Sequence, residues 1–62
     1  MMEYKVVHYQ NEYLSTAILR LEAQVKKLQK EGWRCQGGVA ISFPSTHCAH
    51  VTQAMVKEQR YD

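Results

Sequence analysis

The side chains best suited to chemistry gather in the run His47-Cys48-Ala49-His50, with Cys35 and His8 elsewhere in the chain. Imidazole nitrogens and thiolate sulfurs are ligands that zinc prefers, and a structural zinc site takes about four of them in a tetrahedron. His47 and Cys48 are neighbours in a segment expected to be a strand, where successive side chains point to opposite faces. They cannot both reach one ion in a regular strand, so the sequence predicts no metal site.

The two cysteines are expected to be small buried core residues. Alternation along the predicted strands places Cys35 and Cys48 on one face, close together across a hairpin. A redox pair, or a zinc site that adds the histidines, is the alternative interpretation.

Catalytic groupings are missing from the sequence. A cysteine nucleophile needs a base in reach and an oxyanion site, and a domain of this size offers no obvious cleft within one subunit. The six acidic residues are scattered, and Gly37-Gly38 lies between strand segments instead of before a helix, where a phosphate loop belongs. We therefore expect no enzyme, no catalytic residue and no cofactor.

A set of polar and aromatic side chains is better suited to binding. Arginine and lysine hold phosphates, aromatic rings stack on bases, and amides recognise base edges. The sequence offers these roles to Arg34 and Lys5 or Lys57 for phosphate, Tyr9 for stacking, and Gln36 or Gln53 for a base edge.

Length and charge limit the class of protein. The chain has 62 residues and a formal net charge of +2, with a pI of about 8.7. Nucleic-acid-binding domains more often exceed a pI of about 9, so DNA or RNA is not the expected partner. A domain this small is marginally stable alone, and two cysteines make no disulfide scaffold. A homo-oligomer, dimer or tetramer, is the expected source of further stability.

The start of the chain does not resemble a signal peptide, because Met1 to Tyr9 is polar and strand-like. The longest apolar run is far shorter than the roughly 18 residues of a membrane span. We expect a cytoplasmic protein with reduced thiols and no membrane partner.

The elements follow from periodicity. One α+β domain over residues 1–62 is expected, a βαββ unit with one long helix on a three-stranded, mainly antiparallel sheet. The helix, at about 12–31, starts at an Asn11 cap and carries an apolar stripe of Leu14, Ile18, Leu21, Val25 and Leu28. Strands are expected at about 3–9, 33–43 and 47–57, the last in the middle of the sheet, with a turn at Pro44-Ser45-Thr46 and a polar end at 58–62.

Three glycines and a tryptophan shape the middle of the chain. Gly32 is expected to end the helix in a left-handed conformation, so that Trp33 folds back onto Leu28 in a Schellman-type ending. Gly37 and Gly38 mark a bulge or a close backbone approach in the second strand.

Packing Trp33 under the helix assigns the two faces of the sheet by alternation. The inward set is Tyr4, Val6, Trp33, Cys35, Cys48, Ala54 and Val56, and the outward set is Lys5, Tyr9, Arg34, Gln36, Gln53, Met55 and Lys57.

Three pieces of the chain together resemble a family: Tyr4-Lys5-Val6-Val7, then Glu31-Gly32-Trp33 with Gly37-Gly38-Val39, then Gln53-Ala54-Met55-Val56-Lys57. In this order and spacing they are similar to the short bacterial and phage proteins of the domain-of-unknown-function 1737 family. The resemblance implies a βαββ unit and a bacterial or phage-infected host cell, and no established activity. The run His47-Cys48-Ala49-His50 departs from it, because such proteins often carry aromatic residues there.

Small phage proteins of this build are similar, in size and oligomeric habit, to sponges that sequester nucleotide second messengers of bacterial defence. This is an analogy of fold. The first hypothesis is therefore a non-catalytic, homo-oligomeric phage anti-defence protein that binds a cyclic nucleotide or other small anion at subunit junctions. The alternative is an interaction module that inhibits a host protein through its exposed sheet face.

Overall fold

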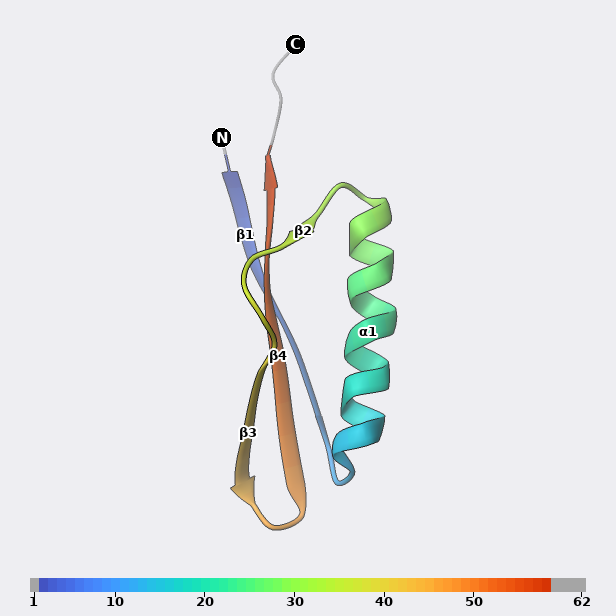
Figure 1. Ribbon diagram of the computed structural model, residues 1–62, viewed down its shortest axis with the longest axis vertical. Coiled ribbons are helices and arrows are strands. Elements are labelled where there is room, and N and C mark those ends of the chain that lie inside the picture. Colours follow the sequence, from blue (N-terminus) through green and yellow to red (C-terminus); the bar gives the residue numbers. More distant parts are fainter. Residues whose placement is uncertain (1, 59–62) are drawn as a thin grey trace.

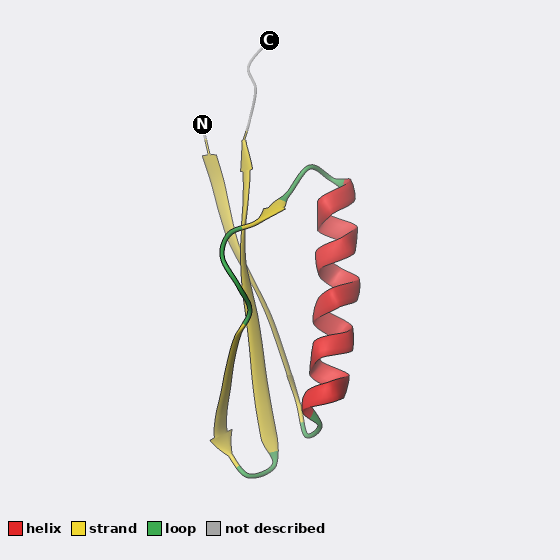
Figure 2. Ribbon diagram, viewed as in Figure 1, coloured by secondary structure: helices red, strands yellow, loops and turns green. Residues whose placement is uncertain are grey.

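The computed structural model describes residues 2–58, which form one helix packed on one face of an antiparallel sheet (Figures 1 and 2). The elements are β1 (Met2–Asn11), α1 (Leu14–Lys30), β2 (Arg34–Cys35), β3 (Ala40–Ser45) and β4 (Cys48–Glu58). The α+β class is therefore as predicted. The predicted polar end lies outside the described residues except for Glu58, which still belongs to β4.

The long strand β4 occupies the middle of the sheet, as expected. It pairs with β1 along one edge and with both β2 and β3 along the other, always antiparallel. The expected count of three strands is wrong, because the second predicted strand is two separate strands. The sheet of the described residues therefore has four strands.

The break between β2 and β3 lies at the predicted glycine pair. Gly37 has a φ of +77°, a left-handed conformation that interrupts an extended strand. The chain resumes pairing at Ala40, opposite Thr52. Pro44 and Ser45, predicted to be a turn, belong to β3 instead.

The helix begins two residues later than predicted. Asn11 ends β1 opposite Ala49, and its Oδ1 accepts a hydrogen bond from the Tyr13 backbone N–H at 2.9 Å. This local turn uses the side chain that was expected to cap the helix, and Tyr13 takes the cap position without a side-chain bond.

The end of the helix confirms the Schellman prediction. The Trp33 N–H donates to the Leu28 carbonyl at 3.0 Å, and the Gly32 N–H donates to the Gln29 carbonyl at 3.1 Å. Gly32 has a φ of +97°, which a glycine adopts without a Cβ penalty.

The core lies between α1 and the strands β1 and β4. It is formed by Val7, Ala17, Leu21, Leu28, Val51 and Met55, with Tyr9, Leu14, Ile18, Val25 and Trp33 packed against it. All five residues of the predicted apolar stripe are in these two groups. The sequence therefore predicted correctly which face of the helix packs on the sheet.

The predicted faces of β1 and β4 are inverted. Val7, Val51 and Met55 are buried under the helix. By alternation Tyr4, Val6, Ala54 and Val56, which were expected to point inward, lie on the opposite face. Lys5, Tyr9, Gln53, Met55 and Lys57 were expected to point outward, and they lie on the helix side.

The cause of this inversion is a register shift of one residue. Cys35 pairs with Met55 and Arg34 with Val56. Trp33 and Cys35 therefore share the inward face with Met55 instead of Ala54. A shift of one residue moves every side chain of a strand to the other face. Arg34 does point away from the helix, as predicted.

Candidate anion-binding site

Two lysines converge on the indole ring of Trp33. The Lys5 Nζ lies 4.7 Å from the ring centroid, and the Lys57 Nζ lies 6.0 Å from it. These side chains come from three elements: β1, β4 and the turn that follows α1. We call Lys5, Trp33 and Lys57 the basic-aromatic cluster.

The helix ending positions this cluster. Trp33 is half-buried against the core, and its backbone is held by the bond to Leu28. A Cβ built on Gly32 would lie 3.5 Å from the Lys57 Cε, so the lysine stem passes closely over the turn. Cations placed over an aromatic face are attracted by its quadrupole, which holds both ammonium groups near Trp33.

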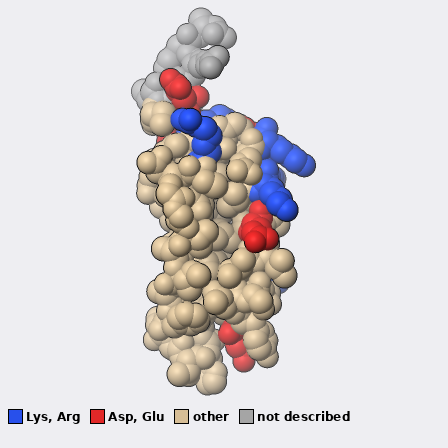
Figure 3. All heavy atoms as spheres, viewed as in Figure 1, with Lys and Arg blue, Asp and Glu red and all other residues tan. Residues whose placement is uncertain are grey.

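Further positive charge lies at the end of α1, just before Trp33 in the chain. Lys27 and Lys30 lie in the last turn of α1, beside the negative end of the helix dipole. In Figure 3 the Lys and Arg side chains of the visible face gather at the end where α1 finishes. The nearest acid along β1 is Glu3, which pairs with Lys57 in the strand register, so an anion must compete with this carboxylate.

The structure brings together two of the six residues proposed for binding. Lys5 and Lys57 meet at Trp33, which had been assigned a structural role only. Arg34 is paired with Val56 on the opposite face of the sheet, and Tyr9 lies four residues along β1 from Lys5, opposite Val51. Side-chain alternation along β1 and β4 places Lys5 and Lys57 on the same face of the sheet. This shared face was the sequence signal that could have identified the cluster.

Gln53 has a structural role. It is only 4% exposed, and its Nε2 donates to the Gly37 carbonyl at 3.1 Å and to the Ala54 carbonyl at 2.9 Å. Its side chain therefore connects β4 to the loop at residues 36–39, between β2 and β3. Gln36 is exposed and joins the same sheet through its backbone N–H, which donates to the Ala54 carbonyl at 2.8 Å.

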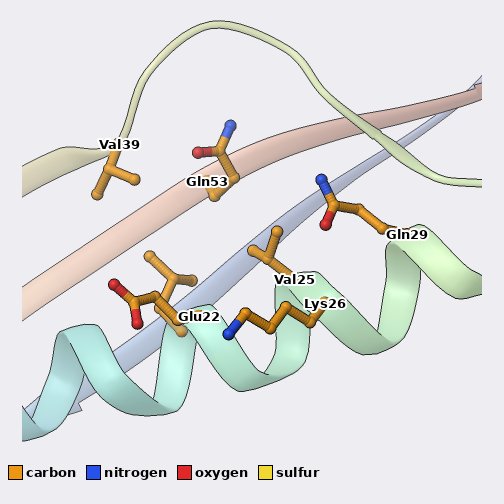
Figure 4. Close-up of a pocket in the computed structure, with 7 residues that line it drawn as sticks. Glu22, Val25, Lys26, Gln29, Val39 and Gln53 are labelled. Carbon is orange, nitrogen blue, oxygen red and sulfur yellow. The ribbon is translucent and has the colours of Figure 1, made fainter.

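A cleft of about 210 Å³ opens between α1 and the loop before β3 (Figure 4). Leu21, Val25 and Val39 make it apolar, Glu22, Lys26 and Gln29 line it from the helix, and Gln53 lines it from β4. It is smaller than the roughly 300 Å³ at which pockets for drug-sized ligands begin. No phosphate-binding group other than Lys26 lines it, so we do not place the ligand here.

Two histidines meet on the face of the sheet that the helix leaves uncovered. His8 Nε2 lies 2.8 Å from His50 Nδ1, and the two rings stack with centroids 4.9 Å apart. The sequence predicts β1 and β4 as neighbouring strands, but no pairing of these two side chains was predicted. Within residues 2–58, no group of three or more His, Cys, Asp or Glu side chains is placed to hold a metal ion.

The expectation of a buried cysteine pair is wrong. Cys35 is exposed and Cys48 is half-buried, and neither forms a disulfide. Cys35 lies opposite Met55, seven residues along β4 from Cys48, which is about 23 Å at the usual rise of a strand. Two cysteines this far apart cannot be bridged.

The described part of the chain contains no helix that is both long and apolar enough to cross a bilayer. Comparison of the chain with family models, with curated proteins and with solved structures finds no match. The resemblance noted from the sequence therefore stays a prediction.

Proposed function

We propose that this chain is a non-catalytic, homo-oligomeric binding protein that captures a small nucleotide-type anion at the basic-aromatic cluster. The observation that carries the proposal is the convergence of the Lys5 and Lys57 ammonium groups over Trp33, at 4.7 and 6.0 Å. Two like charges held beside one ring favour an anion between them.

The cluster offers both parts of a nucleotide site. Each ammonium group has three N–H donors, and a contact with the ring face does not use them as a hydrogen bond to an acceptor would. The donors can therefore bond phosphate oxygens, in competition with the Glu3 carboxylate. Charge-assisted bonds of this kind are about twice as strong as neutral ones.

A flat base has a place to stack. Lys57 is at the outer limit of about 6 Å for a cation over a ring, so its hold on Trp33 is the weaker of the two. In the proposed complex Lys57 swings from the ring to a phosphate, and the base takes its position on the indole. Stacking of this kind contributes about 1–3 kcal/mol per base.

The phage anti-defence sponge is the specific form of this proposal. A sponge needs no catalytic group, and it needs a rigid scaffold with cations and an aromatic ring. The cyclic di- and trinucleotides of bacterial signalling are therefore the first ligands to test.

Isothermal titration calorimetry tests the proposal with three classes of ligand: cyclic dinucleotides, cyclic trinucleotides and inorganic pyrophosphate. Lys5→Met and Lys57→Met keep the side-chain stem and remove the charge. Each is expected to weaken binding by about ten- to a hundredfold, from the loss of about 1.5–3 kcal/mol of charged hydrogen bonding.

Lys27→Met is the matched control. It removes the same charge from the last turn of α1 and leaves the cluster intact, so it should change affinity little. Absence of heat with every ligand would refute the proposal. Equal losses in all three variants would show non-specific attraction to a basic surface instead of a site.

A second candidate, an interaction module for a host protein, is favoured by one observation. Tyr4 and Val6 are 66% and 55% exposed on the uncovered face of the sheet. Exposed apolar patches mark interaction sites. If a second copy of this chain covers that face, the host protein has no access to it, so the oligomeric state decides between the two candidates.

A further inference from the structure

We infer that His8 and His50 form half of a tetrahedral site for a zinc-class metal ion, which the same two histidines of a second copy complete. This inference concerns the outer face, which we define as the sheet face away from α1. It is independent of the anion site, which lies on the helix side.

The two imidazoles are already placed as a chelating pair. His8 lies opposite Thr52 and His50 opposite Gln10, so the two are diagonal neighbours on adjacent strands. Their facing nitrogens are 2.8 Å apart and share a hydrogen bond. Such a bond requires one nitrogen to be an unprotonated acceptor, which is also the form that binds a metal.

A small adjustment turns this hydrogen bond into a metal site. Zinc–nitrogen bonds of about 2.0–2.1 Å at a tetrahedral angle place two ligand nitrogens about 3.3 Å apart, so the pair must open by about half an ångström. The donor nitrogen must also lose its proton to the other nitrogen of its own ring. This tautomer change releases no proton, and both facing nitrogens then hold lone pairs for the ion.

One chain provides only two ligands. Zinc in a structural site takes about four, and no third His, Cys, Asp or Glu in residues 2–58 is placed to join this pair. A two-fold axis between two copies automatically brings the same pair of histidines from the second copy, because such an interface is self-complementary. The count of ligands then becomes four.

The outer face is suited to a second copy. Beside the histidines, this face exposes the β1 residues Tyr4 and Val6. Their β4 partners, Val56 and Ala54, lie on the same face, between β1 and β2. Among residues 2–58, the formally charged side chains of this face are Arg34 and Glu58. They lie toward one end and have opposite signs, so the described parts of two such faces meet without a concentrated like charge. Stacked sheets lie about 10 Å apart, a gap that two imidazoles and an ion between them can span.

Zinc titration of the full chain tests the inference, with binding followed by calorimetry and association by sedimentation over a dilution series. We expect one zinc ion per two chains and a shift of the equilibrium toward the dimer. Cobalt in place of zinc should give the strong visible absorption of a tetrahedral ion.

His8→Asn and His50→Asn should each abolish saturable zinc binding and the zinc-dependent dimer. His47→Asn is the control, because His47 is the remaining one of the three histidines and lies exposed between β3 and β4. Circular dichroism confirms that each variant is folded. The inference is overturned by no zinc binding, by one zinc per chain without association, or by an equal loss in His47→Asn.

Discussion

At the scale of single residues, the two glycines Gly32 and Gly38 have different conformational requirements. Gly32 has a φ of +97° at the end of α1, whereas Gly38 is outside the positive-φ region and has nothing within 4 Å of a built Cβ. Only the first position needs the freedom of a glycine.

Gly32→Ala should therefore destabilise the fold by about 1–2 kcal/mol, the penalty of a left-handed conformation for an L-residue. A Cβ there meets the Lys57 Cε at an ordinary 3.5 Å, so the penalty is conformational. Gly38→Ala should be neutral, or stabilising by up to about 1 kcal/mol. Urea denaturation measures both, and an equal loss in the two variants would contradict this account.

Gln53 carries a second prediction at this scale. Gln53→Ala removes the donor to the Gly37 and Ala54 carbonyls from a buried site and should cost about 1–3 kcal/mol. Backbone hydrogen exchange should also become faster around Gly37. The control, Gln36→Ala, changes an exposed side chain and should stay within about 0.5 kcal/mol of the wild type. A Gln53→Ala variant as stable as this control would exclude the proposed role of the amide.

At the scale of elements, the sequence predicted the helix better than the sheet. The apolar stripe and the Gly32-Trp33 ending are local patterns, set by residues within one or two turns, and both are confirmed. The faces of β1 and β4 depend on register between distant segments, and register here depends on the break at Gly37-Gly38. The local sequence does not indicate how many residues remain unpaired at this break, so it does not determine the register.

The candidate site was predicted only in part, because it too depends on the register between distant segments. Lys5 and Lys57 were chosen for their charge, but the register that brings them to Trp33 was predicted one residue out. Arg34 and Tyr9 were expected beside them. In the observed pairing, Arg34 lies on the opposite face of the sheet, and Tyr9 lies four residues farther along β1 than Lys5.

The contact between α1 and the sheet depends on Leu21, which is 2% exposed. Leu21→Ala should cost about 2–5 kcal/mol, from lost burial and the cavity left behind. That is a large share of the stability of a small domain. Leu19→Ala, at a helix position that is 65% exposed, is the matched control and should cost less than about 0.5 kcal/mol. Similar thermal unfolding of the two variants would contradict the packing described for α1.

At the scale of the whole molecule, a two-layer domain of this size leaves one sheet face without a covering layer (Figure 2). Small domains compensate for limited burial by association, among other means. The outer face, with Tyr4 and Val6 exposed, is the surface on which we expect the second copy.

Val6→Lys should therefore prevent the dimer that we expect for the wild-type chain, because it places a desolvated charge in an apolar interface. The fold of the single chain should survive, since Val6 is 55% exposed. Leu19→Lys adds the same charge on the helix and should remain a dimer. Sedimentation velocity separates these outcomes, and a Val6→Lys dimer would place the interface elsewhere.

We propose that an anionic ligand binds between Lys5 and Lys57 on Trp33. Trp33 is the single tryptophan of the chain, so its fluorescence reports directly on this site. Titration with the ligand that gives the largest calorimetric heat should change Trp33 emission in a saturable way. The midpoint should match calorimetry, move to higher concentration in Lys5→Met and Lys57→Met, and stay in place in Lys27→Met. Calorimetric binding that leaves Trp33 emission unchanged would contradict the account.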